Sequence, residues 1–147
     1  MISERLIADM KDAMKSGDKP RLSVIRMLRA ELKNAHIAAG EELSDAQEQK
    51  VVASYAKKRK EAGQQAEQMG REDVAEQEAF EYSIAMSYLP AQLDEAGLMS
   101  IIKEKIEETG AQGPKDIGKV MKAVMGVVGS QADGSVVSGL VKKALIG

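Results

Sequence analysis

Apolar residues recur every three or four positions along most of this chain, in runs that stop at glycine or proline. The clearest run ends at Gly40 and contains Ile25, Leu28, Leu32, Ala35 and Ala39. Steps of three and four place residues on one face of an α-helix, whereas a half-buried strand alternates at every second position. Only the short stretch Val124–Val128 resembles a strand, and helical sequence flanks it. The pattern therefore predicts an all-α protein.

Helix boundaries are marked by capping residues and by glycines. Ser44 and Gln47 have the spacing of a capping box, in which each side chain accepts a hydrogen bond from the other residue's backbone N–H. Further N-caps are expected at Ser3, Asp18, Asp94 and Ser135. Glycines are the usual helix stops, and we expect them at Gly17, Gly40, Gly70, Gly110 and Gly129. Together these signals predict seven helices.

The third and fourth of these helices predict a long antiparallel hairpin. The third carries a stripe, interrupted by Arg59, of Val52, Tyr55, Ala62, Ala66 and Met69. The fourth follows Gly70 and carries a matching stripe of Ala75, Ala79, Tyr82, Met86 and Leu89. Pro90 ends the hairpin, because the residue before a proline avoids the helical region. We place a domain boundary here, between an N-terminal helical domain (1–90) and a small three-helix C-terminal domain (91–147).

The composition agrees with helix-on-helix packing and limits the chemistry. One Phe, three Tyr and no Trp leave a core of Leu, Ile, Val, Met and Ala. The absence of cysteine excludes disulfides, thiolate metal sites and cysteine nucleophiles. No apolar run follows the first residues, and none reaches the roughly 18 residues of a membrane span. We therefore expect no signal peptide, no membrane association and a cytoplasmic location.

Catalytic residues are scarce in this sequence. The single histidine, His36, lies at the edge of an apolar helix face, so a zinc site or a Ser-His-Asp triad is not expected. The carboxylate pairs are interpreted as solvated helix surface; they are Glu41-Glu42, Glu72-Asp73 and Glu107-Glu108. The glycines lack the spacing of a phosphate-binding loop. The sequence predicts no catalytic residue, no metal and no cofactor.

Basic residues form three groups in a chain whose net charge is −2. Arg21, Arg26, Arg29 and Lys33 recur at helical spacing, and Lys57–Lys60 form a run; interleaved acids such as Glu31 and Glu61 favour ordinary salt-bridged faces. The last group differs, because residues 117–147 hold four lysines and one acid, Asp133. These lysines, which are candidates for contact with an RNA phosphate backbone, are Lys119, Lys122, Lys142 and Lys143.

Several sequence blocks resemble the GatB/YqeY family. The N-terminal part of the resemblance lies in residues 10–30, and the middle part in Gly70-Arg71-Glu72-Asp73 and Tyr88-Leu89-Pro90. Its C-terminal part lies in residues 116–121, in Ala132-Asp133-Gly134 and in the residues that follow. The likeness covers essentially the full chain.

This resemblance implies a helical N-terminal domain joined to a tail similar to the C-terminal domain of the B subunit of tRNA-dependent amidotransferases. Those enzymes amidate Glu-tRNA(Gln) or Asp-tRNA(Asn), and their tail domain contacts the tRNA. The resemblance also implies an association with carbon–nitrogen ligase activity. The phosphorylating, metal-binding and glutaminase machinery of those enzymes has no counterpart in this chain, so the tail is expected to bind rather than to ligate.

Three functional hypotheses follow from these observations. The first is a tRNA-binding accessory protein that contacts phosphates through the four C-terminal lysines. The second is a helical protein-interaction module without RNA binding, whose partner is an amidotransferase or another helical protein. The third, and least favoured, is a carbon–nitrogen ligase with glutamine as amido donor. DNA is not an expected partner, because the chain as a whole is not basic.

Overall fold

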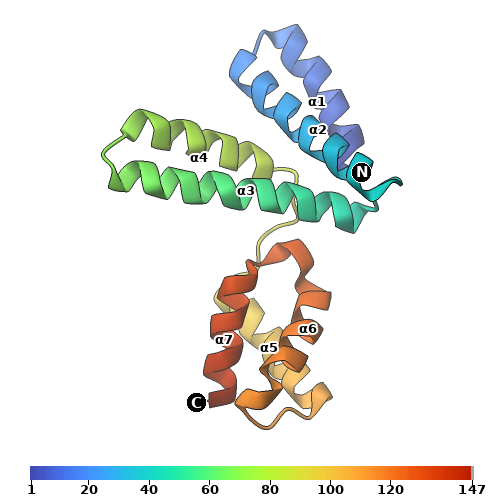
Figure 1. Ribbon diagram of the computed structural model, residues 1–147, viewed down its shortest axis with the longest axis vertical. Helices are drawn as coiled ribbons and strands as arrows, with labels where there is room; N and C mark the ends of the chain where they lie inside the picture. Colours follow the sequence, from blue (N-terminus) through green and yellow to red (C-terminus); the bar gives the residue numbers. More distant parts are fainter. Residues whose placement is uncertain (147) are drawn as a thin grey trace. The chain divides into compact units, whose positions relative to one another are not determined.

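The computed structural model describes residues 1–146, and this part of the chain is entirely helical, without a β-strand (Figure 1). The all-α prediction is therefore confirmed. Within residues 1–146 the α-helices are α1 (Ile2–Ser16), α2 (Lys19–Ala39), α3 (Asp45–Gln68), α4 (Glu72–Met86), α5 (Glu95–Thr109), α6 (Ile117–Val128) and α7 (Gly134–Ile146). Two short 3₁₀ helices flank α6; they are η1 (Pro114–Asp116) and η2 (Gly129–Gln131). None of the described helices is long and apolar enough to cross a membrane.

Most of the predicted helix caps are present. The Asp18 and Asp94 side chains accept hydrogen bonds from the backbone N–H groups of Arg21 (3.3 Å) and Gly97 (2.7 Å). Ser44 and Gln47 form both hydrogen bonds of the predicted capping box. The helices α1, α2 and α5 end at glycines in the left-handed conformation, as expected.

Two predicted caps are wrong. Helix α1 begins at Ile2 instead of after Ser3, because the Ile2 N–H donates to the buried Glu48 carboxylate at 3.1 Å and is thereby satisfied earlier in the chain. Helix α7 begins at Gly134, before Ser135. The Asp133 carboxylate accepts there from the Ser135 backbone N–H (2.9 Å) and hydroxyl (2.8 Å), so the aspartate takes the capping position expected for the serine.

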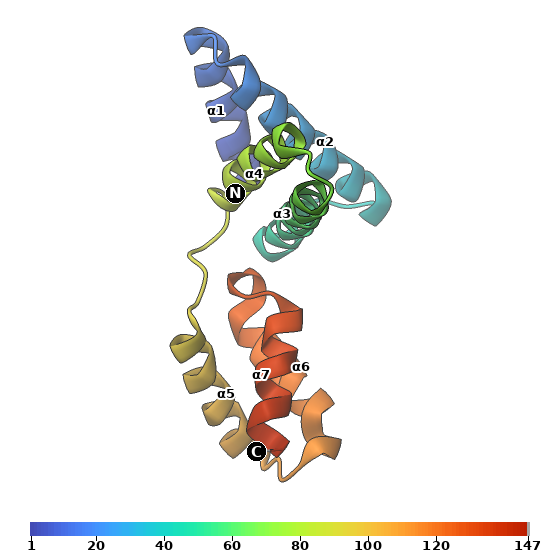
Figure 2. The same cartoon turned by 90° about the vertical axis from the view of Figure 1, so that its left-hand side faces the viewer.

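The chain divides into two compact units, Met1–Pro90 and Ala91–Gly147. In the first unit, α1 packs beside α2, and α3 and α4 run side by side in opposite directions (Figures 1 and 2). The four helices enclose one core, in which the most deeply buried residues are Leu6, Val24, Ile25, Leu28, Val52 and Ala85. Arg5 of α1 also donates to the carbonyl oxygens of Ser87 (3.1 Å) and Tyr88 (3.3 Å), which follow α4. These contacts satisfy acceptors that a helix end leaves open.

The predicted stripe of α4 is wrong at two positions, and one of them is Leu89, which lies beyond the end of the helix at Met86. Ala79 is exposed, whereas Glu78 and Glu81 are partly buried and the buried positions include Ile84 and Ala85. The contact face is displaced because Arg59 of α3 attracts both carboxylates into the hairpin. Met69, which follows the last residue of α3, and Ala39 of α2 are also exposed, and each is at the end of an expected apolar stripe.

The second unit is built from α5, α6 and α7 around a separate core (Figure 2). Its buried residues are Leu98, Ile102, Val120, Val124, Val128, Val137 and Val141. The segment before α5 is tied to η2, because the Leu93 N–H donates to the Gln131 carbonyl at 2.9 Å and the Gln92 side chain donates to the Ser130 carbonyl at 2.9 Å. These contacts close the unit at the end where the chain enters it.

Candidate functional site

The four C-terminal lysines are all exposed, and they lie on two helices. Lys119 and Lys122 share the outer face of α6, opposite the buried residues Val120, Val124 and Val128. Lys142 and Lys143 are consecutive in α7, so their side chains leave the helix about 100° apart. The fold therefore brings the first two lysines onto one face and separates the last two around the axis of α7.

No ion pair neutralises these four lysines among residues 1–146. Val137 and Val141 of α7 point into the core, so the neighbouring lysines remain on the solvent side of the helix. Unpaired ammonium groups on a helix surface suit phosphate oxygens as point charges, and they carry no readout of base sequence.

The described residues contain no arrangement typical of catalysis or of metal binding. No group of three His, Asp or Glu residues within them has a geometry that would hold a metal ion. His36 is exposed on α2, and the three carboxylate pairs are exposed as expected. All of these side chains face solvent, whereas acid–base catalysis usually takes place in a cleft that excludes water.

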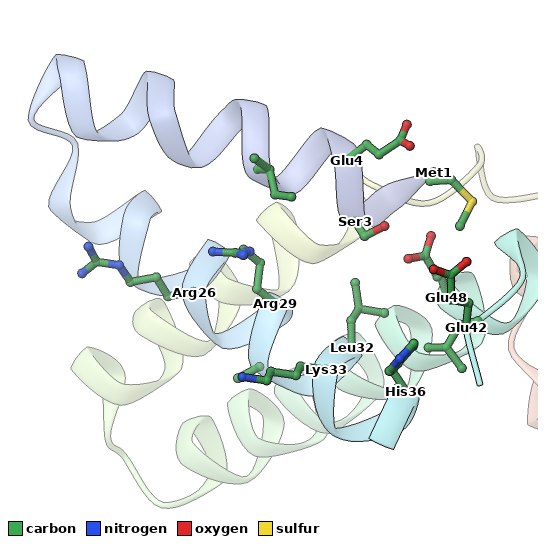
Figure 3. Close-up of a pocket in the computed structure, with 13 residues that line it drawn as sticks. Met1, Ser3, Glu4, Arg26, Arg29, Leu32, Lys33, His36, Glu42 and Glu48 are labelled. Carbon is green, nitrogen blue, oxygen red and sulfur yellow. The ribbon is translucent and has the colours of Figure 1, made fainter. Parts of the chain in front are cut away.

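A groove in the first unit is a feature that the sequence did not reveal (Figure 3). It has a volume of about 600 Å³ and lies between the start of α1, the middle of α2 and the start of α3. Its apolar lining includes Ile7, Leu32 and Leu43. Cationic and acidic side chains surround this surface, and they occupy different ends of the groove.

The cationic end is formed by α2. Arg26, Arg29 and Lys33 follow one another at steps of three and four, so they share one face of the helix. His36 is one step further along this face, on the Glu42 side of the groove (Figure 3). Among the described residues no carboxylate lies within ion-pair distance of these side chains, and the interpretation of this helix as a salt-bridged face is therefore wrong. Arg29 Nη1 donates a hydrogen bond to the sulfur of Met10 at 3.2 Å, and this acceptor carries no charge.

The acidic end lies where α1 and α3 begin. Glu42 and Glu48 are grouped beside Met1 in Figure 3, at the opposite side of the groove from Arg26. The Glu48 carboxylate is occupied by the Ile2 N–H and is 4% exposed, whereas Glu4 and Glu42 face solvent. The groove is therefore polarised, with positive charge along α2 and negative charge near the start of α1.

A second charged cluster lies inside the α3–α4 hairpin. Arg59 Nη1 is 3.2 Å from one carboxylate oxygen of Glu78 and 3.6 Å from one of Glu81, and its guanidinium lies over the Tyr55 ring at 5.4 Å. Both acids come from α4. The sequence suggested Glu61, which lies on α3 with Arg59, as an ion-pair partner instead. Burial, and then the neighbouring Glu81, raise the pKa of Glu78 against the opposing effect of Arg59. The cluster joins the two helices of the hairpin.

Comparison with known proteins places the chain in a family. The model of the Yqey-like proteins matches residues 3–145. The chain belongs to the Yqey-like protein family. A curated relative, "Altered inheritance of mitochondria protein 41, mitochondrial" from Pyrenophora tritici-repentis, is 27% identical over 135 residues, which cover 90% of this chain and 74% of the relative. The family resemblance inferred from the sequence blocks is thus confirmed, and the matched residues include the four lysines and every groove-lining residue except Met1.

Proposed function

We propose that this Yqey-like protein is a tRNA-binding accessory protein that binds without catalysing. One observation carries the proposal: four exposed lysines of the C-terminal unit have no carboxylate partner among the described residues. The resemblance of this unit to the tail of the amidotransferase B subunit identifies tRNA as the polyanion to test. Phosphate contacts through lysine give binding that is sensitive to salt and tolerant of sequence.

The experiment is a titration of labelled tRNA with the full chain at several salt concentrations. With four phosphates contacted, the logarithm of the association constant should fall against the logarithm of the salt concentration with a slope of about −3. Replacing Lys119 and Lys122 by Gln should reduce this slope by about two and weaken binding at low salt, and replacing Lys142 and Lys143 should have a similar effect.

Lys103→Gln is the matched control, because Lys103 is an exposed lysine on α5 of the same unit and is not one of the four. It should leave tRNA binding nearly unchanged. Absence of binding at low salt, or equal loss in the Lys103 variant, would remove the support for the tRNA proposal.

A carbon–nitrogen ligase that uses glutamine as amido donor is the competing enzymatic hypothesis. Its test is incubation of the purified chain with misacylated tRNA, glutamine and ATP. Formation of the amidated aminoacyl-tRNA by the chain alone would show catalysis and would contradict a purely binding role. The exposed state of His36 and of the carboxylate pairs favours the binding role.

A further inference from the structure

We propose that the groove between α1 and α2 is a docking site for an amphipathic helix of a partner protein, whose acidic side chains face Arg26, Arg29 and Lys33. This inference goes beyond the tRNA proposal, because it concerns the N-terminal unit, other residues and another class of ligand. It rests on the unneutralised cations of α2, on the apolar surface beside them and on the acids at the far end.

The cations specify the charge and the length of the occupant. Arg26 and Lys33 are seven positions apart, which corresponds to about 10 Å along α2 or about two turns of a partner helix. Arg26, Arg29 and Lys33 have no ion-pair partner among the described residues, and the Arg29 guanidinium donates a hydrogen bond to the Met10 thioether. Carboxylates of a partner helix could therefore form ion pairs with these cations without displacing an existing ion pair.

The apolar surface requires an occupant with an apolar side. Ile7 remains 38% exposed at the groove, beside the Leu32 and Leu43 side chains. A neighbouring hollow along α2 shares Arg26 and Ala30 with the groove and adds Leu22 and Met27, of which Met27 is 42% exposed. A helix with apolar residues at every third or fourth position would cover these side chains, as in other helix-in-groove interfaces.

The acids at the far end favour a protein over a nucleic acid. A phosphate backbone carries negative charge along its whole length, so it would meet Glu4 and Glu42 as well as the arginines. It also offers no apolar stripe for Ile7. A helix with acidic residues in one half and basic residues in the other half matches both ends of the groove.

The probe for this proposal is a synthetic peptide of about 14 residues, which forms four helical turns. It carries Leu at every third or fourth position, Glu at the other positions of one half and Lys at those of the other half. The isotope-labelled full chain, with any tag at its C-terminal end, is titrated with this peptide while backbone amide chemical shifts are recorded. Shifts are expected at Ile7, Ala30, Lys33 and Leu43, with saturable binding.

Two control peptides and two protein variants test the stated chemistry. The first control has Lys at every charged position and the second has Ser at every Leu position; both should bind at least about tenfold more weakly. In the protein, the double variant Arg26→Glu/Lys33→Glu should weaken the probe about tenfold or more and keep a dispersed amide spectrum. The matched variant Lys58→Glu/Lys60→Glu, on the exposed surface of α3 outside the groove, should bind the probe as the wild type does.

Several outcomes would overturn the proposal. These are an absence of shifts at groove residues at millimolar peptide, equal binding of either control peptide, and unchanged binding by the Arg26/Lys33 variant. Displacement of the probe by tRNA at the same amides would assign the groove to phosphates instead. The failure of this proposal is distinguishable from failure of the tRNA proposal, since the Arg26/Lys33 variant should retain the tRNA affinity that the four lysines supply.

Discussion

The backbone N–H of Ile2, in the first turn of α1, donates to Glu48 of α3 at 3.1 Å, and this glutamate is only 4% exposed. A helix normally satisfies its first amides with a nearby side chain or with water. Here the acceptor comes from another helix, and its negative charge lies at the positive end of the α1 dipole. One carboxylate thus joins the start of α1 to α3.

The variant Glu48→Ala should destabilise the protein by about 1–3 kcal/mol, because it leaves a buried amide without its acceptor. The Glu48→Gln variant keeps an acceptor oxygen, so it should lose less stability than Glu48→Ala does. Urea unfolding of the full chain measures both. Glu41→Ala is the control, since Glu41 is exposed in the loop before α3, and it should stay within about 0.5 kcal/mol of the wild type.

Tyr88 should make stability sensitive to alkaline pH. Burial, followed by the hydrogen bond of 2.5 Å that its hydroxyl donates to Asp9, raises its pKa from 10.0 to about 12. The unfolded chain therefore ionises first, so stability is full below pH 10 and is lost as the pH rises from 10 to about 12. The loss attributable to this group is about 3 kcal/mol.

The Tyr88→Phe variant tests this assignment. It should be less stable at neutral pH by about 1 kcal/mol, because Asp9 loses a hydrogen bond, yet it should lose less stability between pH 10 and 12. Unfolding free energies at a series of pH values give both quantities. Parallel pH curves for the two proteins would show that another group causes the alkaline loss.

Arg59 should prevent carboxylate repulsion in the hairpin. The variant Arg59→Met leaves Glu78 and Glu81 in a partly buried site without their cation, so we expect a loss of about 1–3 kcal/mol at neutral pH. The pKa of Glu78 is already raised, so the folded state binds its proton more tightly than the unfolded state does. The contribution of Glu78 to the stability of the fold is most favourable below its unfolded pKa of about 4.5, and it declines as the pH rises through the folded pKa.

The Arg59 variant should accordingly recover stability relative to the wild type when the pH is lowered from neutral toward 5, because removal of the cation raises the pKa of Glu78 further. Adding Glu78→Gln to the variant should restore part of the loss at neutral pH. Lys60→Met is the exposed control on the same helix. A difference between wild type and Arg59→Met that does not change with pH would contradict the carboxylate explanation.

Two glycines of the second unit should respond to alanine in opposite ways. Gly126 lies inside α6 and is exposed, and an added Cβ would meet no atom within 4 Å, so Gly126→Ala should stabilise by about 0.5–1 kcal/mol. Gly110 ends α5 with φ +66°, so Gly110→Ala should destabilise by about 1 kcal/mol. Urea unfolding monitored by circular dichroism measures both variants, and changes of the same sign would contradict the backbone argument.

The parts of the fold that could be predicted are those whose signals lie within one helix. Helix α5 follows Asp94, carries Leu98 and Ile102 on one face and ends at Gly110, and the structure has the same limits. The predicted cap at Ser3 is wrong because the acceptor for the first amide of α1 is Glu48, far along the chain. The exposure of Ala79 depends on Arg59 of another helix.

The candidate site depends even more on packing between helices. The spacing of Arg26, Arg29 and Lys33 was visible in the sequence, and the interleaved acids favoured ion pairs. Whether those acids reach the cations depends on side-chain directions, and the apolar side of the groove comes from α1, from α2 and from the loop before α3. Neither the reach of the acids nor the position of the apolar side chains can be predicted from the sequence of one helix alone. The four C-terminal lysines could be found in the sequence from helical periodicity and a count of charges alone.

The position of Glu48 has a consequence for motion. The same carboxylate holds the first amide of α1 and lines the groove, so fraying of the first turn of α1 opens one wall of the groove. The groove therefore persists only as long as that turn does, and an occupant that needs the wall must slow the exchange of the Ile2 amide with solvent. Hydrogen exchange at one amide then reports on occupancy of a surface formed by three helices.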